Sequence, residues 1–270
     1  MLVSFEGKEI YVECHGEGVP IVVLNGIMMS APSWKPFIAA LSKQNKLILL
    51  DLLDQGRSGR MNNNPNYNIT IQADVLKCVL DELQIDKANI AGISYGASVA
   101  MNFALKYPGH VDKMVLFNCV PYTSPWLETI GKSWQLARIS PEMYYHATIP
   151  IIYSMDFYNR NLDWIDTRKN FLIQKVFSDS DFLDAMDRLI DSAATHDVRD
   201  KLGDIAAKTL LVGGSEDYLT PLSEQKFIFE HVPDAKLVVM EGCGHAAMYE
   251  QPDVFTSLLT GFINSDSIIL

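Results

Sequence analysis

A serine between two glycines stands out at residues 92–96, where the chain reads GISYG. It follows a short apolar run at 88–91 and precedes small and apolar residues at 97–105, patterns typical of a strand and a helix. A tight turn between such elements would push the Ser94 hydroxyl out of the sheet. The free N–H groups and positive dipole end of the following helix would stabilise an oxyanion there. We therefore expect Ser94 to be a nucleophile in acyl transfer.

Two further chemically useful groups follow apolar runs that are typical of strands. The run at 209–214 is followed by two adjacent acidic residues, and the run at 236–240 by a glycine-rich turn that ends at His245. In an open α/β sheet, ligands bind at the edge where the strands end. His245 can accept the serine proton, and a carboxylate on its other ring nitrogen would fix its tautomer and stabilise the imidazolium. Glu216 or Asp217 could supply that carboxylate.

The rest of the chain alternates between strand and helix patterns. A hairpin pattern at 2–13 precedes buried-strand patterns at 20–24 and 46–51, while helical spacing occurs at 34–41 and 69–83. Continuous apolar runs suit parallel strands that are covered on both faces. We therefore expect an α/β fold in which helices flank a mostly parallel central sheet with right-handed crossovers.

The order of Ser94, an acidic residue and His245, each directly after a strand, resembles the α/β-hydrolase superfamily. The resemblance extends from the first hairpin pattern to the final helix pattern. It implies an α/β-hydrolase core formed by residues 1–120 and 201–270. The block 121–200 interrupts the alternation with helical, aromatic-rich patterns. In the family, an insertion at this point forms a helical cap over the active site, and we interpret the block in that way.

The resemblance also implies roles for individual residues. The family's spacing after the strand favours Asp217 over Glu216 as the acid that orients His245. The family builds its oxyanion hole from two backbone N–H groups. One belongs to the residue after the nucleophile, here Tyr95, and the other to the loop after an earlier strand, here Ile27.

That earlier loop departs from the family's usual His-Gly, because this chain has Asn25-Gly26. An asparagine side chain can brace the loop through hydrogen bonds, although the same pair also makes ordinary turns. Whether the loop keeps the family's shape is open at this stage. Met28, on the same loop, and the cap residues Tyr122 and Trp126 are the residues we expect to line the substrate pocket.

Composition limits the possible partners. The formal net charge is −11, which disfavours binding to nucleic acid or to anionic membranes. Apolar runs are all shorter than a membrane span, and the four cysteines lack metal-site spacing. The chain also starts with a strand pattern instead of a signal peptide, so we expect a reduced, cytoplasmic protein. We expect a small acyl substrate as partner and neither a metal nor an organic cofactor; the oligomeric state is not indicated.

These features predict a serine hydrolase, resembling a carboxylesterase or thioesterase, that cleaves an ester or thioester of a small to medium acyl group through an acyl-enzyme. A serine at position 94 disfavours haloalkane dehalogenases and epoxide hydrolases, which have aspartate there. Carbon–carbon bond hydrolases and acyltransferases of the superfamily share the same three residues. A non-catalytic, hydrolase-like receptor is a further alternative, although a receptor has no need of all three groups.

Overall fold

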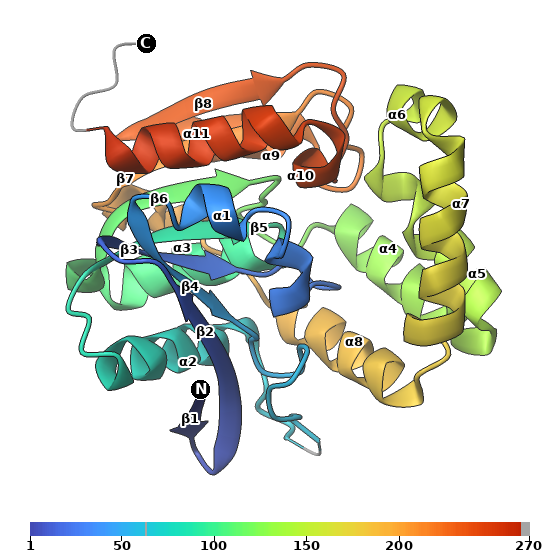
Figure 1. Cartoon of the computed structure of the whole chain (residues 1–270), viewed down its shortest axis with the longest axis horizontal. Helices are drawn as coiled ribbons and strands as arrows, with labels where there is room; N and C mark the ends of the chain where they lie inside the picture. Colours follow the sequence, from blue (N-terminus) through green and yellow to red (C-terminus); the bar gives the residue numbers. More distant parts are fainter. Residues whose placement is uncertain (63, 266–270) are drawn as a thin grey trace.

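An eight-stranded sheet forms the centre of the computed structural model, which describes residues 1–62 and 64–265 (Figure 1). Its strands are β1 (Leu2–Phe5), β2 (Lys8–His15), β3 (Val19–Leu24), β4 (Asn45–Leu50), β5 (Ala88–Ile93), β6 (Val111–Phe117), β7 (Lys208–Gly214) and β8 (Ala235–Met240). They lie in the order β1-β2-β4-β3-β5-β6-β7-β8. β2 pairs antiparallel with β1 and β4, whereas the neighbouring pairs from β4 to β8 are parallel. The expected mostly parallel sheet is therefore confirmed.

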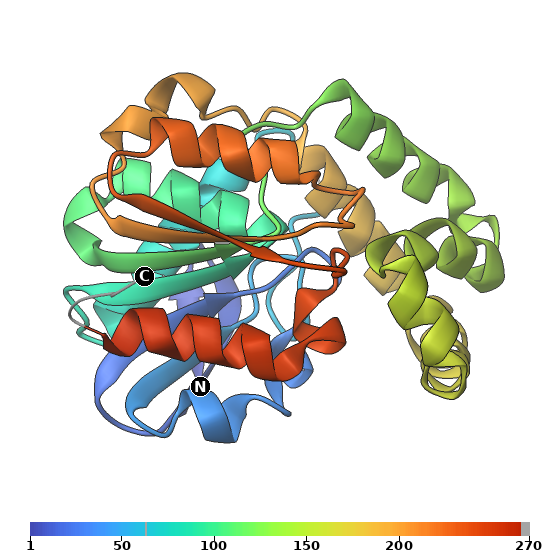
Figure 2. The same ribbon diagram turned by 90° about the horizontal axis from the view of Figure 1, so that it is seen from above.

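Helices cover both faces of the sheet, which explains why its central strands are continuously apolar (Figure 2). One face carries α2 (Ile69–Glu82), α3 (Tyr95–Lys106) and α9 (Leu222–His231). The other carries α1 (Ile38–Leu41), α10 (Ala247–Glu250) and α11 (Pro252–Asn264). Within the described ranges, no helix is both long enough and apolar enough to cross a membrane.

Two helix predictions had different outcomes. The helix expected at 69–83 is present as α2, and the side chain of its N-cap, Asn68, accepts a hydrogen bond from a backbone N–H in the first turn. The single helix expected at 34–41 is wrong. The chain instead forms a 3-10 turn at Ala31–Trp34, followed by the four-residue α1. Pro36, between the two, has no N–H to donate and interrupts the helical hydrogen bonds.

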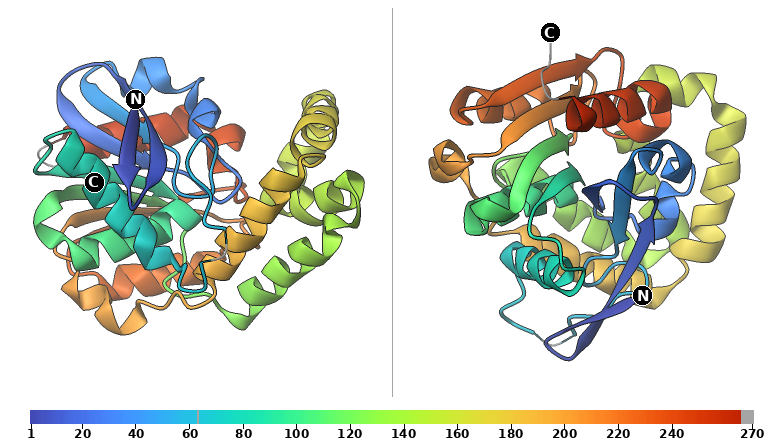
Figure 3. Two further views of the ribbon diagram at one scale, coloured as in Figure 1. Left: turned by 90° about the horizontal axis from the view of Figure 1, so that it is seen from below. Right: turned by 60° about the vertical axis from the view of Figure 1, so that its left-hand side comes forward.

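A group of helices stands beyond the carboxyl ends of the strands, where the cap was expected (Figures 1 and 3). These helices are α4 (Pro125–Leu136), α5 (Pro141–Thr148), α6 (Met155–Arg160), α7 (Leu162–Phe171) and α8 (Ser180–Ala193). Serine side chains cap three of them, at Ser124, Ser140 and Ser154. The limits 121–200 enclose all of these helices. We refer to them together as the cap.

The cap has its own buried cluster, which includes Trp134, Tyr144 and Phe177. Charged groups also connect the cap to the sheet domain, by which we mean the eight-stranded sheet and the helices that cover its faces. Arg188 of α8 donates from Nε and Nη2 to the buried Asp54 Oδ1, at 2.9 and 2.7 Å. Paired charges of this kind hold α8 against the loop that follows β4.

Candidate active site

Ser94 lies in the turn between β5 and α3, as the sequence predicts. Its backbone has φ 52° and ψ −117°, a conformation that side-chain-bearing residues rarely adopt. Gly92 and Gly96 make this turn possible. A Cβ on Gly96 would lie 2.3 Å from the carbonyl oxygen of Leu24, and a Cβ on Gly92 would lie 2.6 Å from Ala97 Cα. The two glycines therefore let the strands and helix approach closely enough to present the Ser94 side chain.

The start of α3 provides a hydrogen-bond donor beside Ser94. The N–H groups of Ala97 and Ser98 donate to the Ser94 carbonyl at 2.9 and 3.1 Å and so form the first turn of the helix. The N–H of Tyr95 precedes them, in the part of a helix where N–H groups lack intrahelical acceptors. Ile27, on the loop after β3, lines the same cavity as Ser94 and Tyr95. The two expected oxyanion-hole residues thus line one cavity together with Ser94.

Asn25 braces the loop that carries Ile27. Its buried Nδ2 donates to the Leu50 carbonyl at 2.9 Å and to Gln55 Oε1 at 3.2 Å. Its Oδ1 accepts from Trp34 Nε1 at 2.7 Å. Gln55 Nε2 in turn donates to the Gly26 carbonyl at 3.0 Å. The asparagine that replaces the family's usual histidine therefore has partners on both ends of its amide, which fixes the loop in place.

His245 and Asp217 form the hydrogen bond that orients the imidazole. His245 Nδ1 lies 2.8 Å from Asp217 Oδ2. Glu216 is half-buried, and its backbone N–H donates to the Cys243 carbonyl. Burial opposes the ionisation of Asp217, but the charge and hydrogen bond of His245 and the hydrogen bonds of Thr220 outweigh it. The pKa of Asp217 is therefore lowered from its usual value.

Two residues that the sequence analysis missed complete this arrangement. Asn118 Nδ2 donates to Asp217 Oδ2 at 2.8 Å, and Thr220 Oγ1 donates to the same oxygen at 2.6 Å. Asn118 follows β6 directly and has a φ of 49°. It carries the same signal as Ser94, a polar residue immediately after an apolar strand, and that signal could have identified it.

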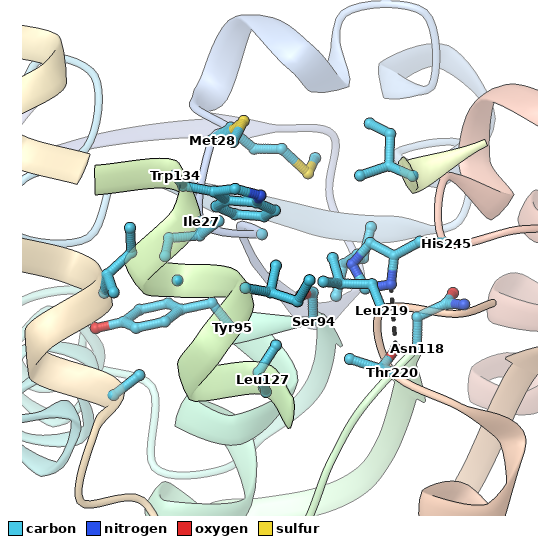
Figure 4. A pocket seen from close by; sticks show the side chains of 18 of the residues that line it. Ile27, Met28, Ser94, Tyr95, Asn118, Leu127, Trp134, Leu219, Thr220 and His245 are labelled. Carbon is cyan, nitrogen blue, oxygen red and sulfur yellow. Dashed lines mark hydrogen bonds between the residues drawn. The ribbon is translucent and has the colours of Figure 1, made fainter. Parts of the chain in front are cut away.

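A cavity of about 390 Å³ opens above Ser94 and His245 (Figure 4). It lies between the sheet domain and the cap, and most of its walls are apolar. Lining side chains include Met28, Leu127, Trp134, Leu172, Phe177 and Leu219. A cavity of this size and lining suits a small organic substrate, with polar groups at one end to hold the reacting atoms.

Tyr122 and Trp126 do not line this cavity, so their assignment to the pocket is wrong. Within the described residues, the wall of the cavity includes neither of them. Tyr122 pairs with Asp197 in an isolated β-bridge, and the Arg199 guanidinium lies 3.9 Å from the centre of its ring. Trp126 is 51 % exposed and donates from Nε1 to the Tyr218 carbonyl at 3.1 Å.

The phase of α4 explains the error at Trp126. Leu127, Ile130 and Trp134 all line the cavity, and their spacing of three and four residues places them on one face of the helix. Trp126 precedes this series by one residue and so belongs to another face. Met28, by contrast, lines the cavity as expected.

The chain belongs to the alpha/beta hydrolase family, whose family model matches residues 21–258. A crystal structure of MGS-M2, an alpha/beta hydrolase enzyme from a Medee basin deep-sea metagenome library, is similar with a TM-score of 0.96. The two chains are 45 % identical, with 100 % of this chain and 99 % of the other covered. The expected superfamily and fold are therefore confirmed.

Curated proteins that align with nearly the full length of this chain are hydrolases. The putative carbamate hydrolase RutD of Azorhizobium caulinodans is 29 % identical, with 94 % of each chain covered. The 2-hydroxy-6-oxo-6-phenylhexa-2,4-dienoate hydrolase of Burkholderia cepacia is 28 % identical, over 94 % of this chain and 91 % of that one. The protein is accordingly a hydrolase.

Proposed function

We propose that the protein hydrolyses carboxylic esters or thioesters of small to medium acyl groups through an acyl-enzyme on Ser94. The observation that carries this proposal is the convergence of two groups on one cavity. Ser94 enters it from a strained turn, and His245 enters it with Nδ1 held by Asp217 at 2.8 Å. This is the arrangement that an activated serine nucleophile needs.

The proposed reaction has two halves. Ser94 Oγ attacks the substrate carbonyl carbon while His245 Nε2 takes the hydroxyl proton, and the Asp217 carboxylate stabilises the imidazolium. The N–H groups of Ile27 and Tyr95 donate to the oxyanion of the tetrahedral intermediate. Collapse breaks the bond to the leaving oxygen or sulfur, which receives the proton from His245. Water then gives a proton to His245, attacks the acyl-enzyme and releases the acid, and Ser94 regains its proton.

The cavity favours an acyl group of limited length. Its apolar walls, formed by side chains such as Leu127 and Phe177, reward burial of methylene groups. Each buried methylene contributes about 0.8 kcal/mol, or roughly fourfold in binding. Affinity should therefore increase along a series of acyl chains until the cavity volume of about 390 Å³ is filled.

Carbon–carbon bond hydrolysis is the second candidate function. It is favoured by the relative from Burkholderia cepacia, which is named as a hydrolase of a 2-hydroxy-6-oxo-dienoate. An acyltransferase would use the same residues with an acceptor other than water. A hydrolase-like receptor would use the cavity alone, without turnover.

A side-by-side substrate panel separates ester or thioester hydrolysis from carbon–carbon bond hydrolysis. The panel contains p-nitrophenyl esters from acetate to decanoate, acyl-coenzyme A thioesters, lactones, an aryl carbamate and a 2-hydroxy-6-oxo-dienoate. We expect the highest kcat/KM on an ester or thioester. A kcat/KM on the dienoate that exceeds every ester and thioester by tenfold or more would replace the proposed function with carbon–carbon hydrolysis.

A further inference from the structure

Arg168 of α7 is a cation on the wall of an otherwise mostly apolar cavity. Its guanidinium lies beside a pair of aromatic rings, 5.4 Å from the centre of Trp164 and 4.6 Å from that of Tyr249, whose centres are 6.0 Å apart. Tyr249 belongs to α10, which follows His245, so Arg168 lies where the cap meets the sheet domain. Its Nε is buried and has no hydrogen-bond partner among the described residues.

The charge of Arg168 has no acidic partner in the described part of the chain. None of the ion pairs there includes it, and its electrostatic neighbours are the phenol groups of Tyr153 and Tyr249. Every other arginine of the described residues forms an ion pair with a carboxylate. A partly buried cation without an anion costs free energy, which a bound anion would recover.

The other charged residues on the cavity wall already have partners. Lys132 pairs with Glu128 at 2.5 Å, and Asp191 accepts a hydrogen bond from Gln135 Nε2 at 2.9 Å. Arg168 is thus the charged group on this wall that is left for a ligand.

Trp134 of α4 offers a second donor to the same cavity. Its side chain lines the wall and is only 5 % exposed, yet its indole N–H has no partner among the described residues. In Figure 4 the indole nitrogen is on the side of the ring that faces Met28 and His245. A buried donor without an acceptor is uncommon and points to an oxygen supplied from outside the chain.

We propose that Arg168 and Trp134 bind a carboxylate that the substrate carries away from its scissile bond. The inference rests on the proposed function, because it assigns the far end of the same substrate. A guanidinium fork matches the two oxygens of a carboxylate. The preferred substrate is therefore a half-ester or half-thioester of a dicarboxylic acid, with an apolar spacer between its two ends.

The direct test measures equilibrium binding to the Ser94→Ala variant by calorimetry, so that no turnover intervenes. The probes are monomethyl adipate, its neutral analogue dimethyl adipate, and 6-acetoxyhexanoate, which carries the carboxylate on the alcohol side of the ester. We expect monomethyl adipate to bind at least tenfold more tightly than dimethyl adipate, as hydrogen bonds to charged groups allow. Tighter binding of 6-acetoxyhexanoate than of monomethyl adipate would contradict the acyl-side placement.

Substitutions in that background identify the residues. Arg168→Gln should weaken binding of monomethyl adipate by tenfold or more and leave dimethyl adipate within twofold. Arg168→Lys keeps the charge without the fork and should give an intermediate loss. Trp134→Phe removes only the N–H and should cost about threefold to tenfold. Arg160→Gln is the matched control, because Arg160 is an exposed cap arginine paired with Asp156, and it should change nothing.

The possible results separate the two proposals. Equal binding of the mono- and diester, or full monoester binding by both Arg168 variants, would overturn the carboxylate site while leaving Ser94 chemistry intact. Full binding by Trp134→Phe would remove Trp134 from the site. Strong, Arg168-dependent monoester binding by a protein whose wild type cleaves no ester would support the carboxylate site and overturn the proposed function alone. Near-ultraviolet circular dichroism checks that each variant keeps its aromatic packing.

Discussion

Replacing Asp217 with asparagine changes one carboxylate oxygen into an NH₂ group at a site where every contact is from a donor. Asp217 Oδ1 accepts from the backbone N–H groups of Leu219 and Thr220 at 2.9 and 2.8 Å. Asp217 Oδ2 accepts from Thr220 Oγ1, from Asn118 Nδ2 and from His245 Nδ1. An amide can therefore not satisfy both ends in either orientation.

The geometry decides which orientation is less costly. With its NH₂ at the Oδ1 position, the amide leaves two buried N–H groups without acceptors, at a cost of about 2–6 kcal/mol in total. With its NH₂ at the Oδ2 position, it leaves one buried donor, Asn118 Nδ2, without this acceptor, because the Thr220 hydroxyl can turn to accept instead of donate. In this orientation the amide donates to His245 Nδ1 and moves the ring proton to Nε2. We expect the second orientation. His245 then cannot accept the Ser94 proton, and kcat should fall by about 10³–10⁴-fold, or roughly 4–5.5 kcal/mol in the barrier.

The assay compares Asp217→Asn with Glu216→Gln, using p-nitrophenyl butyrate at pH 7.5. Glu216 contacts the neighbouring loop through its backbone N–H, so the glutamine variant keeps that contact and should stay within about threefold of wild type. Circular dichroism confirms that both variants fold. An Asp217→Asn enzyme within tenfold of wild type, or a larger loss in Glu216→Gln, would refute this reasoning.

Two further predictions concern stability and selectivity. Burial lowers the pKa of His196 to about 4, so the folded protein keeps this ring neutral while the unfolded chain protonates it below about pH 6.5. The contribution of the neutral His196 ring to the free energy of unfolding is complete above pH 6.5. It declines as the pH falls to 4, by up to about 3 kcal/mol. Urea unfolding at pH 7.5 and 4.5 should show that the free energy of unfolding decreases less between these pH values for His196→Asn than for wild type. Equal decreases in the two proteins would contradict the prediction. Leu127→Ala should shift the preferred p-nitrophenyl ester to a longer acyl chain by enlarging the cavity, whereas Trp126→Ala should keep the wild-type profile. Identical profiles for wild type and Leu127→Ala would show that this wall does not select the substrate.

Local pattern was enough to place Ser94 and His245, because the features that position them lie within a few residues. Close packing at Gly92 and Gly96 requires glycine, and this requirement is visible in the sequence. The choice of Asp217 over Glu216 needed the family resemblance, since both residues follow β7. The structure then brings Asp217, and not its neighbour, against the imidazole.

The sequence was enough to predict that the cap is helical, but not which face of each cap helix lines the cavity. Its helical character follows from the patterns of 121–200, yet the face that α4 presents to the cavity depends on how α4 packs against the sheet domain. A one-residue difference separates Trp126, on the outside, from Leu127, on the wall. Asn118 and Asp217 show the same limit, because their contact joins residues 99 positions apart and no local pattern encodes it.

Covalent labelling tests the central claim most directly. Folded wild type is treated with a fluorophosphonate, and the modified peptide is located by mass spectrometry, with Ser94→Ala as the control. The proposed role of Ser94 predicts one adduct, on Ser94, with loss of ester hydrolysis in proportion to labelling, and no adduct on the variant. An unlabelled wild-type protein, or a Ser94→Ala variant that still hydrolyses esters at the wild-type rate, would contradict it.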